Sequence, residues 1–366
     1  MGRFSSILLL LLVACGDNLT DDGVVSGLPD QVHPNGNGTA LPRYVPAVCG
    51  VQSWTTELAA DAMNVSVAPH PAGAAVLAVP RAGGSIAGFV LDTRMDMINA
   101  TKVPIDGTYT QVTASYLNDR TVAAAVHDDT IVVSLLDENL ANPQLLAKVP
   151  GRFLAEPALF HTQSELVMPV VGDDGLWLHR FDKSLTLLDS KHVLATAPAT
   201  AMTAAQLGVA MLTAWSTESD CHLMLTSTYS PGTTAHVESA CNAPRVAVDQ
   251  HTGAGVMVFE GTDGVHEMPI QQTQFGGASR LVRPGSSAPR TLFDGTSFWV
   301  SYLDERGDII VGFLDANRHL VSMSLAGPKP TAGAYDLVMV GQNPWVLSLG
   351  SDGYSAYRLC VEPQAY

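Results

Sequence analysis

The chain has few charged residues, and the basic ones are the scarcest. Only 15% of its 366 residues are charged, and 19 Lys and Arg face 35 Asp and Glu, which gives a formal net charge of −16. A protein that binds nucleic acid needs a basic face, so we expect no nucleic-acid partner. The same excess of acid disfavours direct contact with an anionic membrane surface.

Long hydrophobic runs are also missing, since no stretch reaches the ~20 apolar residues of a membrane-spanning helix. The run from Ile7 to Val13 has seven residues and follows the basic Arg3. A basic start and a short apolar run are typical of a secretory signal peptide. The rest of the chain is therefore expected to fold in water.

Residues 12–15, Leu-Val-Ala-Cys, resemble the lipobox of bacterial lipoproteins. The resemblance implies a signal peptide over 1–14, cleavage before Cys15, and a diacylglycerol group on the Cys15 sulfur. Two or three acyl chains anchor a protein stably, because each buried methylene contributes ~0.8 kcal/mol. The alternative is an ordinary secretory signal with an incidental cysteine. Gly16 rather than Asp follows the cysteine, so we expect anchoring in the outer membrane of the cell envelope rather than in the inner one.

Residues 15–43 are expected to form a flexible tether. They are rich in Gly, Asp, Asn and Pro and show no strand or helix period, so they cannot bury enough apolar surface to order themselves. A tether of this length has a root-mean-square reach on the order of 30 Å. Removal of Arg3 with the signal peptide leaves 18 basic and 35 acidic residues, a formal charge of −17.

The mature domain lacks a convincing amphipathic helix and instead repeats every 45 residues or so. Apolar runs typical of strands begin 46, 44, 44, 46, 42 and 48 residues apart, at 75–79, 121–126, 165–171, 209–215, 255–259, 297–303 and 345–349. An apolar residue followed by Asp comes after several of these runs, at Asp92, Asp137, Asp182 and Asp315. Four-stranded units at this period predict a β-propeller.

We therefore predict an all-β domain over 44–366, a seven-bladed β-propeller of four-stranded antiparallel blades. The predicted blades are approximately 64–107, 108–151, 152–197, 198–242, 243–286, 287–328 and 329–361. The last blade lacks a fourth strand, and an N-terminal strand at 44–53 is expected to supply it and close the ring. A pair of β-sandwiches would not give seven near-equal units, and an open solenoid usually has shorter repeats.

Four cysteines remain once lipid takes Cys15, and outside the cytoplasm an even set is expected to pair. Cys221 is predicted to begin the third strand of the fourth unit and Cys241 to end its fourth strand, in a hairpin that turns near 230–232, so the two should face each other. Ring closure would place Cys49 beside Cys360 and form the second disulfide. The alternative is four free thiols, because buried single cysteines are common.

Motifs of catalysis are also missing. The segment 83–87, Gly-Gly-Ser-Ile-Ala, lacks the last Gly of the hydrolase elbow and lies in a predicted hairpin. His127, His161, His179 and His266 lie in or beside strands without the spacing of zinc ligands. No phosphate loop, dinucleotide fingerprint or calcium loop is present, so the sequence points to no catalytic residue and no cofactor.

Acidic residues recur in the turns between the second and third strands, which all open on one face of a propeller. The weak candidates for a cation site are Asp128, Asp129, Asp173 and Asp174. The first unit has Arg81 at the corresponding turn. Further acidic residues lie in the later turns, at 218, 220, 260, 263, 304, 305, 308 and 352. Asp is simply a good turn residue, and that interpretation stays open. The other interpretation is an acidic ring that holds a divalent cation or attracts a basic partner.

Two functions from different classes fit these observations. The favoured one is a monomeric, membrane-anchored binding or scaffold module of the envelope, whose partner is an envelope protein or glycan. The alternative is a glycan-acting hydrolase or lyase that works at the channel mouth. Tryptophans on strands are expected to pack between blades, although they could also form a platform for sugars. The chain also resembles the propeller lipoproteins of outer-membrane assembly, which dock partner proteins and usually have eight blades.

Overall fold

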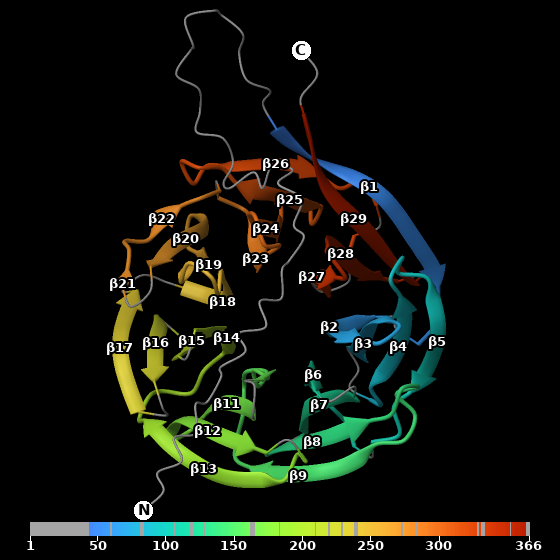
Figure 1. Cartoon of the computed structure of the whole chain (residues 1–366), viewed down its shortest axis with the longest axis vertical. Coiled ribbons are helices and arrows are strands. Elements are labelled where there is room, and N and C mark those ends of the chain that lie inside the picture. The colour runs from blue at the N-terminus through green and yellow to red at the C-terminus, as the bar shows by residue number, and fades with distance from the viewer. Residues whose placement is uncertain are drawn as a thin grey trace, which may run out of the picture.

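The computed structural model describes residues 44–363 apart from 59–60, 81–83, 106, 118–119, 128, 162–164, 183, 209, 219, 228–229, 238–240, 272–273, 283, 328, 331–333 and 352. For 227, 230–233 and 235–237 it describes the backbone alone. The predicted signal peptide, Cys15 and the tether lie outside these residues. The described strands form seven antiparallel sheets, which are arranged as blades around a central axis (Figure 1). Among the same residues, no helix could span a membrane.

The first four blades each contain four strands in chain order, from the inner strand to the outer one (Figure 1). Blade 1 consists of β2 (Ala62–His70), β3 (Gly73–Pro80), β4 (Ala87–Asp92) and β5 (Met97–Lys102). Blade 2 consists of β6 (Gln111–Leu117), β7 (Arg120–His127), β8 (Thr130–Leu136) and β9 (Gln144–Pro150). Blade 3 consists of β10 (Phe160–His161), β11 (Leu166–Gly172), β12 (Gly175–Phe181) and β13 (Leu187–Leu194). Blade 4 consists of β14 (Ala201–Leu207), β15 (Ala210–Ser216), β16 (Cys221–Ser227) and β17 (Ser230–Val237).

Of the remaining blades, blade 6 keeps this plan, whereas blades 5 and 7 depart from it at their outer strands. Blade 5 consists of β18 (Cys241–Val248), β19 (Ala254–Gly261) and β20 (Gly264–Gln271), with two short outer pieces, β21 (Gln274–Phe275) and β22 (Ser279–Arg280). Blade 6 consists of β23 (Ser287–Phe293), β24 (Phe298–Leu303), β25 (Ile309–Leu314) and β26 (Leu320–Ser324). Blade 7 consists of β27 (Tyr335–Val340), β28 (Asn343–Gly350), β29 (Gly353–Pro363) and β1 (Tyr44–Thr55). The predicted seven-bladed ring is therefore confirmed.

Strand β1 closes the ring as the outer strand of blade 7. It runs antiparallel to β29 from the pair Tyr44↔Pro363 to the pair Thr55↔Gly353, with a bulge at Cys49. Cys49 is bonded to Cys360, 311 residues away in the sequence, as predicted. In Figure 1 the first and last strands lie side by side at the rim, so the two ends of the domain are joined both by a β-ladder and by a covalent bond.

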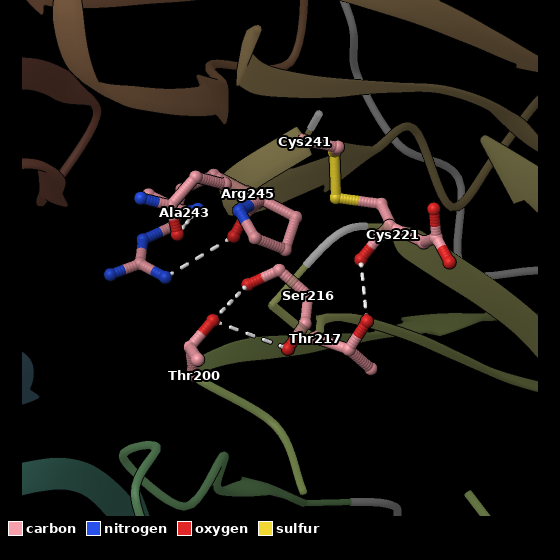
Figure 2. The surroundings of a disulfide bond; sticks show 10 residues. Thr200, Ser216, Thr217, Cys221, Cys241, Ala243 and Arg245 are labelled. Carbon is pink, nitrogen blue, oxygen red and sulfur yellow. Dashed lines mark hydrogen bonds between the residues drawn. A yellow bond between two sulfur atoms is a disulfide. The ribbon is translucent and has the colours of Figure 1, made fainter. Parts of the chain in front are cut away.

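The second disulfide joins Cys221 to Cys241, but it lies between blades rather than within one. Cys241 begins β18, the inner strand of blade 5, so the prediction that it ends the fourth strand of blade 4 is wrong. Strand β17 is already complete at Val237, and Val237 is the residue that pairs with Cys221. Because the chain has passed to the next blade by Cys241, the bond crosses from β16 to β18 (Figure 2).

The hydrophobic core is divided into layers between neighbouring blades. Each of the seven pairs of adjacent blades shares its own cluster of buried apolar side chains, and we call these layers seams. Trp215, Trp299 and Trp345 are buried in the seams, as the packing interpretation predicted, whereas Trp177 is only partly buried. Full burial of a large apolar side chain contributes on the order of 3 kcal/mol, so the seams are the main source of cohesion in the ring.

The Asp residues of the sequence repeat close the turns between third and fourth strands. In blade 1, Asp92 Oδ1 accepts the backbone N–H groups of Arg94 and Asp96, both at 2.8 Å. This turn holds Met95 in the left-handed region, at φ 67°, a conformation that costs a non-glycine residue ~1–2 kcal/mol. The same position in blades 2, 3 and 6 is held by Leu140, Leu185 and Arg318.

Each of these left-handed residues inserts its side chain against the preceding blade, and we call them plug residues. Met95, Leu140 and Leu185 are buried in three seams. Arg318 instead donates two hydrogen bonds, of 3.1 and 2.7 Å, to the carboxylate of Glu267 in blade 5. The Glu267 side chain is only 5% exposed. The contact that each plug residue makes with the preceding blade offsets the strain of its turn.

Candidate functional site

One end of the central channel collects the beginnings of the inner strands and the turns between second and third strands. The chain runs along the first strand and returns along the second, so both features lie on one face. We call it the entry face. Glu156 precedes β10 and Asp336 is the second residue of β27, which places both at this face. Arg245 and Arg290 lie near the middle of β18 and β23.

The predicted acidic turns lie on the entry face, and several of their carboxylates have local partners. Asp129, Asp173 and Asp174 are exposed, and Asp174 Oδ1 accepts a hydrogen bond of 2.9 Å from the Trp177 indole. Asp263 lies 2.6 Å from His266 Nε2 and 3.3 Å from Arg280 Nη1. Asp128, Arg81 and Asp352 lie outside the described residues. The contacts of Asp174 and Asp263 fit the interpretation that these acids stabilise turns.

The candidate cation ligands Asp129, Asp173 and Asp174 do not assemble into a group of three ligand atoms. Within the described part of the chain, the sole group of three or more possible metal ligands is Cys49, Cys360 and Glu362. The two cysteines of that group are bonded to each other, so they offer no thiolate. The cation interpretation of the acidic turns stays a prediction.

A network of polar side chains that the sequence interpretation missed crosses the channel. Glu156 Oε1 accepts a hydrogen bond of 2.7 Å from Arg245 Nη2, and Glu156 Oε2 accepts one of 3.0 Å from Asn64 Nδ2. Asn64 Oδ1 in turn accepts the backbone N–H of Val112 at 2.8 Å. Arg245 Nη1 donates to the carbonyls of Met202 and Pro244, at 3.4 and 3.2 Å. These contacts connect blades 1 to 5 across the channel.

The other side of the channel carries a looser pair. Arg290 Nε lies 3.8 Å from Asp336 Oδ1, which is beyond hydrogen-bonding distance. The Arg290 guanidinium lies over the Tyr335 ring, 5.1 Å from its centroid, and its Nη1 donates to the Pro289 carbonyl at 2.9 Å. The Tyr335 hydroxyl donates to the Ala288 carbonyl at 2.6 Å. The aromatic ring and the backbone, more than the carboxylate, fix the Arg290 side chain.

Burial shifts the pKa values of these groups towards their neutral forms. It raises the pKa of Asp336, against the attraction of Arg290. It lowers the pKa of Arg245, against the attraction of Glu156. It raises the pKa of Tyr335 to about 12, so this phenol stays protonated in the physiological range. The channel is therefore a place where charges are poorly hydrated and need partners.

A repeated backbone device places both arginines. Ala243 and Ala288 adopt left-handed conformations, at φ 46° and 49°, and each lies in a bulge that interrupts the strand pairing just before an arginine. Each is followed by Pro and Arg, so the tripeptide Ala-Pro-Arg occurs twice, 45 residues apart. Figure 2 shows the first copy, with Arg245 a few residues beyond the Cys221–Cys241 bond on the same strand. An identical tripeptide at the blade period was the sequence signal that would have revealed the site.

The other residues singled out in the sequence do not converge. Ser85 is exposed in the connection between β3 and β4. His179 is buried, with Nδ1 2.8 Å from Ser190 Oγ, and burial lowers its pKa to about 4. His266 contacts Asp263 on the rim of the entry face. These residues belong to different blades, and none lines the channel.

Comparisons with known proteins address the fold. No family model matches the chain, and no curated protein matches its sequence. Among solved structures, the chain is similar to BamB from Moraxella catarrhalis, with a TM-score of 0.53 and 12% identity over 85% of this chain and 99% of that one. It is also similar to the Dos1 propeller, with a TM-score of 0.54 and 10% identity over 82% of each chain. At these identities the likeness shows the propeller fold alone.

Proposed function

We propose that the chain is a lipid-anchored binding platform of the bacterial cell envelope, which docks a partner without changing it chemically. The observation that carries the proposal is the use of cysteine. The two disulfides use every cysteine except Cys15. Disulfides persist in oxidising compartments outside the cytoplasm, and the one cysteine left over stands at the lipobox. This pattern supports both export and lipidation, and Gly16 favours the outer membrane.

The closed ring supports docking rather than large movement. Seven seams and a covalent closure hold the blades in fixed positions, and preorganised surfaces bind partners with little backbone change. The exposed carboxylates of Asp129, Asp173 and Glu218 on the entry face favour a partner with a basic face, because complementary charge speeds association and selects partners.

Lipidation is tested by feeding cells a labelled palmitate and isolating the protein. We expect label on the chain that begins at Cys15 and none on the Cys15→Ser variant, which should leave the membrane fraction. Equal label on both forms, or release of both as soluble protein, would contradict the anchor.

Docking is tested by crosslinking the full-length protein in its own envelope and identifying what is recovered. One protein at a fixed ratio to the chain supports the platform, whereas a glycan would favour the glycan-acting alternative. The triple change Asp129→Asn, Asp173→Asn and Glu218→Gln should reduce crosslinking, while the matched control Glu138→Gln, exposed in the β8–β9 turn of the opposite face, should not. Unchanged crosslinking in the triple variant would remove the entry face from the proposal.

A further inference from the structure

The channel contains a recess of about 150 Å³ to which every blade contributes at least one lining residue. Its polar lining consists of Ser66, Thr113, Glu156, Thr203, Arg245, Arg290 and Asp336. The Arg290 and Asp336 side chains remain 16% and 24% exposed, so solvent reaches both. The recess has room for roughly five water molecules at ~30 Å³ each, which is also the room of a very small organic molecule.

The two charge pairs in the recess are unequal. Both carboxylate oxygens of Glu156 accept hydrogen bonds, from Arg245 and from Asn64. Arg290, by contrast, uses only Nη1, towards backbone carbonyls, and its Nε and Nη2 have no hydrogen-bond acceptor among the described residues. Asp336 Oδ1 accepts the Leu337 N–H at 2.9 Å, and no donor to its Oδ2 is found in the same part of the chain. The Nε and Nη2 donors of Arg290 and the Oδ2 acceptor of Asp336 therefore remain available for a ligand, and they lie next to each other.

The backbone that presents Arg290 is strained at Ala288, and the same strain recurs at Ala243. A left-handed alanine costs ~1–2 kcal/mol, and such strain is concentrated at functional sites. The strain turns two guanidinium groups from neighbouring inner strands towards one recess. A structural role alone accounts for Arg245, because its Nη2 donates to Glu156 and its Nη1 to two backbone carbonyls. It leaves the free Nε and Nη2 donors of Arg290 unexplained.

We propose that this recess binds a small zwitterion of the α-amino acid type, with its carboxylate on Arg290 and its ammonium group on Asp336. Arg290 and Asp336 already face each other across 3.8 Å, so a simple anion on Arg290 would add a second negative charge beside Asp336, and a simple cation on Asp336 would add a second positive charge beside Arg290. Buried charges need partners of the opposite sign, so a ligand that carries both signs on neighbouring atoms completes both groups. The size of the recess limits the side chain to that of glycine, alanine or serine.

This binding site goes beyond the docking role and does not depend on it. The full-length protein, kept in detergent micelles, is titrated calorimetrically at pH 7 with alanine, with propionate, with ethylamine and with glucose. Alanine should bind at a ratio of one to one. Propionate and ethylamine each lack one charged group and should bind on the order of tenfold more weakly or worse, because each loses a charge-assisted hydrogen bond. Glucose tests whether a neutral polyol satisfies the same groups.

Three outcomes overturn the proposal: no binding of alanine; propionate or ethylamine binding as tightly as alanine; or glucose binding more tightly than alanine. Any of these would leave crosslinking to an envelope partner unaffected, so the two proposals fail separately.

Variants localise the site. Arg290→Gln and Asp336→Asn should each weaken alanine binding on the order of tenfold or more, and the matched control Arg94→Gln, exposed at the opposite face, should bind alanine as the parent does. Unfolding midpoints measured without ligand show whether each variant is folded. If Arg290→Gln does not fold, Arg290→Lys keeps the charge but loses the planar guanidinium fork, and it should still bind more weakly. A folded variant of either residue with parental affinity refutes the assignment.

Discussion

Acid should weaken the fold through His179, whose side chain is only 6% exposed in β12. Burial lowers the pKa of His179 from 6.5 to about 4. Between these two pH values the imidazole is therefore protonated in the unfolded chain and neutral in the native protein. The stability that neutral His179 provides is therefore complete above pH 6.5 and is lost as the pH falls towards 4. At 1.36 kcal/mol per pKa unit, the loss by pH 4.5 is about 2.5 kcal/mol.

The assay is urea unfolding at pH 7.5 and at pH 4.5, on the parent and on His179→Gln. The difference in unfolding free energy between the two pH values should be smaller in the variant by about 2.5 kcal/mol. His319, which is 77% exposed, supplies the matched control, and His319→Gln should keep the parental pH dependence. If His179→Gln loses as much stability in acid as the parent, then burial of this imidazole does not govern the acid response.

Three further predictions concern the seams and the disulfides. Leu140→Ala should lower the unfolding free energy by about 2–5 kcal/mol in a urea titration, because the plug residue leaves a cavity, and a loss below 1 kcal/mol would show that the turn relaxes to fill it. Arg318→Leu alone should cost about 3 kcal/mol, because Glu267 becomes a buried unpaired charge, whereas the double change with Glu267→Leu should recover most of the loss in a double-mutant cycle. Replacing Cys49 and Cys360 by Ser should lower the melting temperature more than replacing Cys221 and Cys241, because loops of 311 and 20 residues correspond to roughly 6 and 3 kcal/mol. The reverse order would refute the loop-entropy account.

The repeat made the ring predictable. Strand-like runs near 45 residues apart, and the orphan segment at 44–53, were enough to predict the blades, the closing strand and the Cys49–Cys360 bond. The Asp landmarks were recognised as periodic, but their role was not visible, because the left-handed turn and the plug residue emerge only when neighbouring blades are in place.

The repeat could not predict the position of Cys241 or the polar network in the channel. There is a separate physical reason for each. A strand boundary between adjacent blades leaves no break in composition around Cys241, so the last strand of one blade and the first of the next are hard to separate. In the channel, Glu156 contacts an arginine two blades away, and the bulges at Ala243 and Ala288 redirect the side chains that follow. The alternation of apolar and polar residues along a regular strand cannot predict either effect. The repeated Ala-Pro-Arg tripeptide, however, is visible in the sequence.

The Cys49–Cys360 bond makes the backbone between these residues a covalent circle. A protease that cuts one exposed turn of the propeller opens this circle but releases no fragment, so the nicked molecule keeps its mass and both halves of every seam. A second cut at a different turn is needed before a piece can leave, and reduction is needed to reveal the first cut on a gel. The ring should therefore tolerate a first cleavage without losing a blade.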